Sequence, residues 1–500
     1  MHKLFRAIIL LTTVILCCSQ NIFAQPAPVQ NEENLPTDYL TKDFHAGRRA
    51  AVRDLMPDNS VMVIFAYPTR TFSNDVDYLY HQNPDLYYFS GYKEPHSLLL
   101  IFKEPQTDSA GNQYNELLFV QKRNPQAEQW TGRRMGTDGA KEKLGINMVF
   151  NGADFKNFNI DFSKFAKIIV DKFPVDIPNG SDNADLYDLV QQFKTKTDYS
   201  QLPPQPARFD TKLFRDLTNA LRGIKTPEEL VLIRKAVEIS CQGQNEVMKA
   251  LNPNMSELEI QGLHEYIHKK YGAEEVGYGS IVGSGENGCV LHYMENAKTK
   301  IGTQMVLMDV GAEYHGYTAD VTRTVPVDGK FSAEERIIYQ LVYDAQEAAF
   351  KILKNGAKWS DASAAAKNII AEGLLKLGII SDKKEVNKYY PHGLSHHIGL
   401  DVHDKGTYDT LKKDMVITIE PGIYIPEGSK CDKKWWSIAV RIEDDALITE
   451  DGYELLSRFA PRKIEDVEKM VAQKSAVDDL KLPPLESGNL PASRQGKKGF

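Results

Sequence analysis

The chain has 500 residues, of which 42% are apolar and 26% charged, and this composition excludes a mostly disordered protein. It contains one long apolar run, at the N-terminus, so a protein with several membrane spans is excluded. Its 60 basic and 68 acidic side chains give a net charge of −8, without the basic excess that nucleic-acid binding favours.

The first 24 residues have the pattern of a secretory signal peptide. Two basic residues precede the apolar run 7–18, and the small residue Ala24 ends the segment. This order predicts export with cleavage after residue 24, followed by a flexible linker over residues 25–37. A membrane anchor is the main alternative, but the run is too short to cross about 30 Å of hydrocarbon. A lipid-modified Cys17 or Cys18 is disfavoured by the large residue or the cysteine that precedes each.

From about residue 40 the chain shows the mixed pattern of an α/β protein. Strands are expected at 61–67, 97–102, 116–121 and 167–171, and a helix at 186–193. The proline-rich segment 202–209 breaks both periodicities and is a suitable boundary, since domains have about 150 residues. We therefore expect one domain over residues 38–205, a second over residues 206–475, and a disordered tail over residues 476–500.

The second domain is expected to open with a well-defined helix. Thr226 is a candidate N-cap, Pro227 fits the first helical position, and Glu229 completes a capping box. A further helix is expected to start after Ser256. Strands are then expected at 305–310, 318–327, 415–425 and 437–449, with helices at 333–354 and 360–378 between the two pairs.

Outside the leader, three widely spaced cysteines remain: Cys241, Cys289 and Cys431. An odd number at such spacing fits neither a disulfide framework nor a cysteine metal site. Three buried thiols are expected, with one disulfide as the alternative.

Two aspartates flank a turn in the second domain. Asp309 ends an apolar strand, and Asp320 lies in the next strand, after a turn-prone segment. A hairpin of this length would bring the two carboxylates close together. Like charges on apolar strands are unfavourable unless a cation neutralises them, although two solvated acids are the simpler interpretation of this pair alone.

Two glutamates follow a similar pattern. In their predicted strands, Glu420 and Glu443 point away from the apolar face that alternate residues form, and Pro421 then interrupts the first strand. Solvent-facing acids are one interpretation. Thr418 and Ala439 share these faces, however, and neither is typical of a solvated surface, so we expect the faces to be partly buried.

Histidines cluster in the same part of the chain. Six of the twelve fall between residues 292 and 403, and four of these lie in the segment 392–403. Four carboxylates with an imidazole form a hard, oxygen-rich ligand set, which suits two divalent cations, with Mn²⁺ ahead of Zn²⁺ or Co²⁺. Two ions about 3.5–4 Å apart can share a hydroxide nucleophile and polarise a carbonyl group.

A competing motif lies on a predicted helix. The segment from His264 to His268 matches the H-E-x-x-H pattern of zinc peptidases. The helical period places both histidines at the margin of the apolar face, towards the polar side, which predicts a half-exposed helix flank. No second helix supplies a third ligand soon afterwards. We therefore interpret the match as a coincidence and expect replacement of Glu265 to leave activity unchanged.

Five segments of the second half resemble, in order, those of the pita-bread metallopeptidases, the group that contains aminopeptidase P, prolidase and methionine aminopeptidase, and most closely those of family M24B. They are 281–293, 308–331, 392–404, 418–425 and 440–445. The first-half segments 81–95 and 130–145 resemble the N-terminal domain of bacterial aminopeptidase P. The resemblance spans about residues 40–460. It implies a creatinase/prolidase-like α/β domain followed by a pita-bread metallopeptidase domain.

The resemblance also implies roles for individual residues. The metal ligands of the family fall on Asp309, Asp320, His396, Glu420 and Glu443. Its other site residues fall on His292, His392, His403, Arg441 and Tyr424, of which the last two form hydrogen bonds around the ligands. It assigns no role to His315 or His397, and it makes the H-E-x-x-H segment an ordinary helix of the fold.

The implied activity is that of a metallo-exopeptidase, an Xaa-Pro aminopeptidase, which hydrolyses the first bond of peptides whose second residue is proline. The implied cofactors are two divalent metal ions, and the implied nucleophile is a hydroxide that bridges them. Glu420 would accept its proton, His292 and His403 would hold the scissile carbonyl, and His392 would shape the pocket. A dimer or tetramer is the implied assembly.

Three alternatives remain at this level. Prolidase, which cuts Xaa-Pro dipeptides, shares the metal site, but the segment 132–136 and Ser395 resemble aminopeptidase P more closely. Methionine aminopeptidase lacks the N-terminal domain. A catalytically inactive binding protein of the same fold would not need all five ligand residues.

Overall fold

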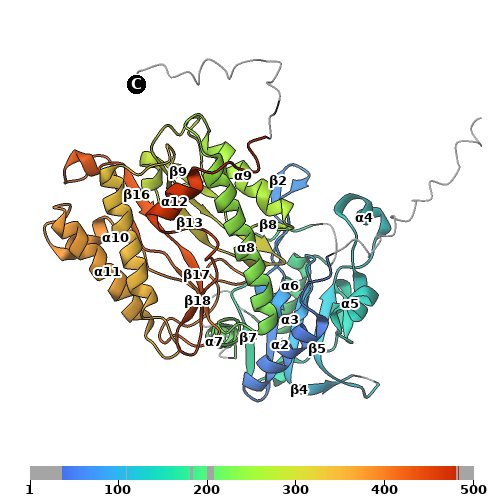
Figure 1. Cartoon of the computed structure of the whole chain (residues 1–500). Coiled ribbons are helices and arrows are strands. Elements are labelled where there is room, and N and C mark those ends of the chain that lie inside the picture. The colour runs from blue at the N-terminus through green and yellow to red at the C-terminus, as the bar shows by residue number, and fades with distance from the viewer. Residues whose placement is uncertain (1–35, 109, 181–183, 200–207, 480–481, 483–500) are drawn as a thin grey trace, which may run out of the picture. The chain divides into compact units, whose positions relative to one another are not determined.

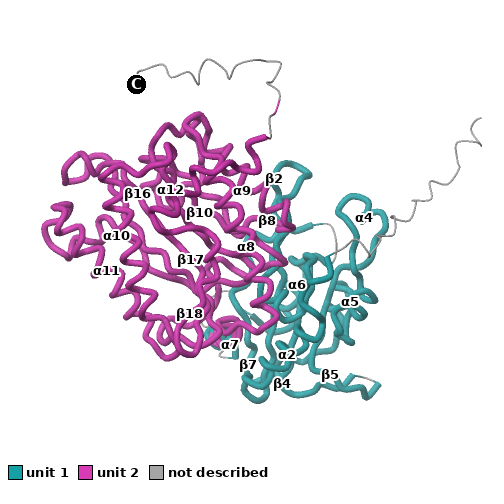
Figure 2. The backbone as a smooth tube through the Cα atoms, viewed as in Figure 1, with its two compact units in different colours: residues 1–215 teal, residues 216–500 magenta. Residues whose placement is uncertain are grey.

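The computed structural model describes residues 36–108, 110–180, 184–199, 208–479 and 482. The chain forms two compact units, the first ending at Arg215 and the second starting at Asp216 (Figure 2). The predicted leader, most of the linker, most of the tail and the predicted boundary after residue 205 lie outside the described residues. Within the described ranges, none of the helices is long and apolar enough to span a membrane.

A five-stranded mixed sheet forms the core of the first unit. Its order is β6 (Val149–Asn151), β5 (Gln113–Val120), β4 (Leu98–Thr107), β1 (Ser60–Phe65) and β7 (Lys167–Val170). β1 pairs antiparallel with β4 and parallel with β7. All six residues of β1 are buried, which is typical of a central strand covered on both faces. The four strands predicted for this half are confirmed.

Helices and a short hairpin complete the first unit. They are α2 (Lys42–Leu55), α3 (Pro84–Ser90), α4 (Pro125–Thr131), α5 (Gly136–Leu144), α6 (Leu186–Lys196) and the hairpin of β2 (Thr71–Ser73) with β3 (Val76–Asp77). The helix predicted at 186–193 is α6. Asp185 caps it by accepting a hydrogen bond from the backbone N–H of Asp188.

Two helices of the second unit begin where their caps predict. After α7 (Thr211–Arg222), Thr226 and Glu229 form the expected reciprocal capping box at the start of α8. Ser256 caps the following helix. The helices are α8 (Pro227–Ala250), α9 (Glu257–Lys270), α10 (Ala333–Phe350), α11 (Trp359–Lys376) and α12 (Ile464–Val471).

The strands of the second unit form several small antiparallel sheets. One sheet has the order β13 (Val321–Pro326), β10 (Met305–Val310), β9 (Ile281–Ser284), and a second has the order β12 (Tyr317–Thr318), β11 (Ala312–Tyr314), β8 (Glu275–Val276). A third has the order β14 (Val416–Ile419), β17 (Asp444–Ile448), β18 (Tyr453–Leu455). The fourth pairs β15 (Gly422–Ile425) with β16 (Ile438–Arg441). In Figure 1 β13, β17 and β18 lie between α8, in green, and the orange pair α10 and α11. This layering gives the pita-bread fold that the sequence predicted.

Three of the predicted strands are broken. The prediction of one strand over 318–327 is wrong, because β12 ends at Thr318 and β13 starts at Val321 in another sheet, so Asp320 lies at the break. The segment 415–425 divides at Pro421 as expected, but 437–449 also divides, between Arg441 and Asp444, which was not expected. The parts pair separately, since β14 pairs with β17 while β15 pairs with β16. The prediction of one continuous strand over 437–449 is therefore wrong. Where a strand leaves one partner for another, its backbone turns, and such turns re-aim side chains.

The cysteines also depart in part from expectation. Cys241 is buried, but Cys289 and Cys431 are only partly buried, and all three are free thiols. The expectation of three buried thiols is therefore wrong for two of them, because Cys289 and Cys431 pack at the edges of the apolar clusters rather than inside them.

Candidate active site

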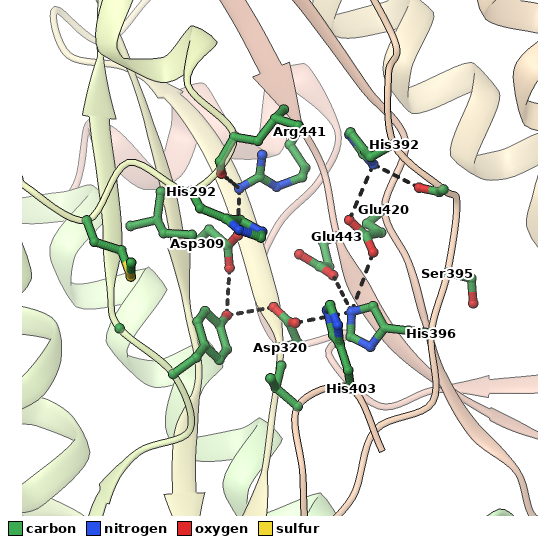
Figure 3. A pocket seen from close by; sticks show the side chains of 17 residues that line it. His292, Asp309, Asp320, His392, Ser395, His396, His403, Glu420, Arg441 and Glu443 are labelled. Atoms are coloured by element: carbon green, nitrogen blue, oxygen red, sulfur yellow. Dashed lines mark hydrogen bonds and ion pairs between the residues drawn. The ribbon is translucent and has the colours of Figure 1, made fainter. Parts of the chain in front are cut away.

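The second unit encloses a cavity of about 420 Å³ that brings together residues distant in sequence (Figure 3). It is lined by nine of the ten predicted site residues: His292, Asp309, Asp320, His392, His396, His403, Glu420, Arg441 and Glu443. The tenth, Tyr424, is buried beside the cavity and hydrogen-bonds two of its lining residues. The sequence-predicted set therefore forms one site.

Three of the carboxylates lie at points where the chain leaves one strand or sheet for another. Asp320 lies between β12 and β13, Glu420 follows β14, and Glu443 lies between β16 and β17. Asp309 alone lies within a strand, in β10 opposite Thr322 of β13. The backbone N–H of Asp320 donates to Asp445 Oδ2 at 3.0 Å. Side chains at such breaks point out of the sheets, so acids from separate sheets can meet.

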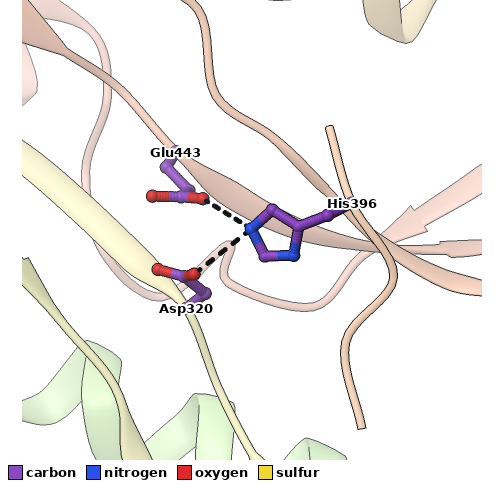
Figure 4. A group of neighbouring side chains, drawn as sticks. All are labelled: Asp320, His396 and Glu443. Carbon is purple, nitrogen blue, oxygen red and sulfur yellow. Dashed lines mark ion pairs between the residues drawn. The ribbon is translucent and has the colours of Figure 1, made fainter. Parts of the chain in front are cut away.

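His396 is held with one ring nitrogen facing the acids (Figure 4). Its Nδ1 lies 3.0 Å from the carbonyl oxygen of His397, so Nδ1 is the donor to the backbone, and a neutral ring would have its lone pair on Nε2. Nε2 lies 3.5 Å from Asp320 Oδ2, 3.5 Å from Glu420 Oε1 and 4.0 Å from Glu443 Oε1. A backbone acceptor on the second nitrogen is the usual arrangement for a metal-binding histidine.

The electrostatics of the cluster favour a bound cation. Burial and the neighbouring carboxylates raise the pKa of Glu420 to about 8 and that of Glu443 well above its usual value. Burial and Asp309 likewise raise the pKa of Asp320. Burial disfavours a charged His396, but Asp320 and Glu420 outweigh this and raise its pKa to about 9. Acids this close resist ionising together unless positive charge joins them.

The donor set also fits a divalent metal ion. Glu443 Oε2 accepts a hydrogen bond from Thr322 Oγ1 at 2.7 Å, whereas the buried Oε1 has no hydrogen-bond partner in the described part of the chain. One ligand atom each from Asp320, His396 and Glu443 lie within 4.8 Å of one another. Carboxylate oxygens with one imidazole suit Mn²⁺ and Zn²⁺, and a cation would satisfy the unpartnered oxygen.

A chain of hydrogen bonds runs behind the ligands. Arg441 Nη2 donates to Asp309 Oδ2 at 2.5 Å, and Nη1 donates to the Tyr424 hydroxyl at 2.8 Å. That hydroxyl lies 2.8 Å from His392 Nε2. Burial disfavours ionisation of Asp309, but Arg441 and Tyr278 outweigh it and lower the Asp309 pKa. The resemblance predicted hydrogen-bonding positions for Arg441 and Tyr424, and both side chains occupy such positions here.

Tyr278 is a site residue that the sequence did not indicate. Its hydroxyl lies 2.6 Å from both Asp309 Oδ1 and Asp320 Oδ1. A phenol has one hydrogen to donate, so the second short contact needs a proton on a carboxyl group or a cation nearby. Tyr278 lies just before the matched segment 281–293, outside any polar motif, and only the fold brings it to the aspartates.

Two histidines are exposed at the margin of the cavity. His292 and His403 both have solvent-accessible side chains and line the cavity from separate loops. The ring of His403 lies 4.1 Å from that of His396, and burial together with His396 lowers the His403 pKa. His392 is more enclosed, and burial with Arg441 lowers its pKa to about 4. A neutral imidazole has one N–H, so a neutral His403 can donate one hydrogen bond to a ligand.

The H-E-x-x-H segment lies on α9, outside the cluster. The predicted half-exposed position is wrong, since His264 is fully buried and His268 is 1% exposed. They pack against α8, where Gly243 leaves room: a Cβ there would lie 3.0 Å from His268 Nε2. Glu265 Oε1 accepts hydrogen bonds from Gln261 and Ser280. The helical period predicted too much exposure for the two histidines, because Gly243 on the neighbouring helix lets their side of α9 pack closely against α8.

The two histidines without a predicted role have local packing contacts. His315 Nδ1 lies 2.9 Å from Glu274 Oε1. His397 lies with its ring centroid 5.1 Å from that of Trp359, and its Nε2 is 3.0 Å from the carbonyl oxygen of Thr407. Neither lines the cavity of the metal-ligand residues.

Comparison with known proteins agrees with this geometry. The model of metallopeptidase family M24 matches residues 231–450, and that of the aminopeptidase P N-terminal domain matches residues 45–167. The chain is 34% identical to the Xaa-Pro aminopeptidase of Escherichia coli (strain K12) over 455 residues, which is 86% of this chain and 97% of that protein. It is 33% identical to the Xaa-Pro aminopeptidase of Haemophilus influenzae over 447 residues, 86% of this chain and 98% of that protein.

A solved structure, aminopeptidase P from Escherichia coli with the inhibitor Pro-Leu, matches with a TM-score of 0.76 and 32% identity, covering 87% of this chain and 98% of that one. The similarity extends through both units and is too high in identity to reflect the fold alone. The chain therefore belongs to metallopeptidase family M24, as a metallo-aminopeptidase with an N-terminal aminopeptidase P domain and a C-terminal pita-bread domain.

Proposed function

We propose that the chain is an Xaa-Pro aminopeptidase that removes the N-terminal residue from peptides with proline in the second position. One observation carries the proposal: the five predicted ligand residues line one cavity, with His396 Nε2 facing three of the acids. The curated relatives named Xaa-Pro aminopeptidase support the substrate class. A bond to proline lacks an amide hydrogen and is constrained, so it calls for a dedicated site.

Asp309, Asp320, His396, Glu420 and Glu443 would hold two divalent cations, which we propose to be Mn²⁺ because the set is rich in oxygen. When bound, the ions would polarise the scissile carbonyl and lower the pKa of a shared water to near neutrality. The unpartnered Glu443 Oε1 supports this placement, since it lies on the side of His396 Nε2. No thiol lines the cavity, which disfavours a purely structural zinc site.

The remaining residues have distinct proposed tasks. Glu420 accepts the proton of the attacking water and delivers it to the proline nitrogen as that nitrogen leaves. His292 and His403, exposed at the cavity margin, donate hydrogen bonds to the scissile carbonyl oxygen as negative charge develops on it. His392, held by the Tyr424 hydroxyl, shapes the pocket, and Arg441 fixes Asp309 from behind.

A peptide panel tests the proposed specificity. Purified enzyme is treated with a chelator, reloaded with Mn²⁺, and assayed on Xaa-Pro-Yaa tripeptides, Xaa-Pro dipeptides and Xaa-Ala-Yaa controls. Cleavage of the Xaa-Pro bond in tripeptides, lost on chelation and restored by Mn²⁺, is expected. Activity confined to dipeptides would instead identify a prolidase, and no hydrolysis with full metal loading would support a binding protein.

We propose that the protein is exported and that it assembles into a dimer or tetramer. The charged, apolar and small-residue order of the first 24 residues supports export. N-terminal sequencing of protein from the periplasm or medium should begin at Gln25, and an intact Met1 would contradict cleavage. Light scattering of the purified chain should give two or four times the mass of the mature chain.

A further inference from the structure

We propose that Glu257 is a positioning residue that sets the place of His292 in the active site. Glu257 is the first residue of α9 and is fully buried, far in sequence from the predicted ligands. It does not line the cavity. Its carboxylate instead binds the loop of residues 284–298, which carries His292. The inference rests on the proposed role of His292 in substrate hydrolysis.

Both carboxylate oxygens of Glu257 accept hydrogen bonds from this loop. Oε1 accepts from the backbone N–H of Ser284 at 2.8 Å, the Ser284 hydroxyl at 2.9 Å and Asn287 Nδ2 at 3.0 Å. Oε2 accepts from the backbone N–H of Lys298 at 2.8 Å, the Tyr293 hydroxyl at 3.1 Å and Asn287 Nδ2 at 3.2 Å. The buried carboxylate of Glu257 thus accepts hydrogen bonds from the start, middle and end of the loop.

The backbone adds to this connection. The N–H of Glu257 donates to the carbonyl oxygen of Lys298 at 3.0 Å, so the two residues are bonded in both directions. Tyr293 is the neighbour of His292 in sequence, and its hydroxyl also accepts from the backbone N–H of Ala297 at 3.0 Å. The hydroxyl of the residue next to His292 is therefore fixed by the same acid that holds both ends of the loop.

The loop around His292 combines exposed side chains with two, Leu291 and Tyr293, that pack against a small apolar cluster. His292 is exposed, as are Val290 (56%) and Met294 (60%). An exposed loop tip is mobile unless its ends are tied down. A histidine that must meet a carbonyl oxygen within hydrogen-bonding distance gains from an anchored backbone, because misplacement by about 1 Å can cost about 10²-fold in rate.

The chemistry requires a carboxylate at this position. All the contacting groups are donors, and an ionised acid accepts several hydrogen bonds at each oxygen. Glutamine has the same shape, but its amide nitrogen would point N–H groups at the N–H of Ser284 or Lys298. The position at the N-terminus of α9 further stabilises the negative charge.

A double-mutant cycle tests the inference. The variants are E257Q, H292A and the double variant, with E259Q as the matched control because Glu259 is an exposed acid on the same turn of α9. We expect E257Q to lower kcat/KM about 10-fold at unchanged metal content, E259Q to leave it unchanged, and E257Q to change it less than 2-fold in the H292A background. A 10-fold loss in both backgrounds, or none in either, would overturn the inference.

A second variant and a second measurement guard against trivial failure. If E257Q does not fold, Y293F can replace it, since it removes one of the donors to Glu257. Y293F should lower kcat/KM by less than 10-fold, and only when His292 is present. The imidazole NMR signal of His292, assigned from the H292A spectrum, should shift or broaden in E257Q but not in E259Q. That spectrum reports loop position without activity, so it separates failure of this inference from failure of the proposed function. An unchanged His292 signal in E257Q would contradict it.

Discussion

Two histidine sites in the second unit are both buried but electrostatically opposite. His396 meets carboxylates, which outweigh burial and raise its pKa to about 9. Among the described residues, His264 and His268 have no hydrogen-bond partner on any of their four ring nitrogens. Burial lowers both pKa values, that of His268 to about 4. Within the described ranges, the H-E-x-x-H histidines therefore lie in an environment without ligand partners, whereas His396, which belongs to no such motif, lies in a cluster of carboxylates.

The difference shows what makes a buried imidazole a metal ligand. Two histidines four residues apart on a helix share a face whatever surrounds them, so the motif is easily met by chance. A cluster such as that around His396 requires acids from separate sheets to converge, which is unfavourable unless a cation is bound. Four predictions test this contrast.

The largest expected effect is at the ligand cluster. Glu420→Gln should reduce kcat by about 10³-fold or more, because it removes both an anionic ligand and the proposed proton acceptor. Steady-state kinetics with Mn²⁺-loaded enzyme, together with metal analysis, measures this. Glu427→Gln, an exposed acid seven residues on, serves as the control and should retain full activity. Near-normal kcat in Glu420→Gln would remove Glu420 as base and ligand.

A smaller effect is expected at Tyr278. Tyr278→Phe removes the hydroxyl that lies 2.6 Å from Asp309 and Asp320. Loss of such a supporting hydrogen bond typically weakens metal affinity 10- to 100-fold, so reactivation of the chelated variant should need correspondingly more Mn²⁺. Tyr266→Phe, on an exposed tyrosine, should follow the wild-type curve. Identical curves for all three proteins would show that the hydroxyl does not support the ligands.

The motif histidines should affect stability rather than catalysis. The folded state keeps His268 neutral down to about pH 4, whereas the unfolded chain takes up its proton below about pH 6.5, so stability falls as pH decreases between these values. Between pH 8 and pH 5, the unfolding free energy of His268→Leu should therefore fall by about 2 kcal/mol less than that of the wild type. Denaturant unfolding at both pH values measures this. An unchanged pH dependence would mean that His268 is protonated in the folded protein.

The smallest effect is expected at Glu265. Its carboxylate hydrogen-bonds Gln261 and Ser280, and glutamine can keep an acceptor there. Glu265→Gln should therefore change kcat by less than 2-fold in the peptide assay. A loss comparable to that of Glu420→Gln would instead assign the chemistry to the H-E-x-x-H helix.

Much of the fold could be predicted from local patterns. Capping at Thr226, the buried apolar run of β1 and the periodicity of α10 are local properties, and the structure confirms them. The break before Glu443 was not predicted, because the apolar alternation continues through Ile442 and only a change of pairing partner divides the strand. The exposure of His268 was misjudged because Gly243 lies on another helix.

The sequence by itself determined the type of side chains available: four acids and one imidazole in recognisable segments, a leader pattern and an α/β alternation. The tertiary structure alone decided that Tyr278 joins the two aspartates, that Glu257 holds the loop of His292, and that His264 and His268 are buried. The physical reason is that hydrogen bonding and burial depend on which distant segments meet. Spacing along one chain specifies a helix face or a strand face, but not what packs against it.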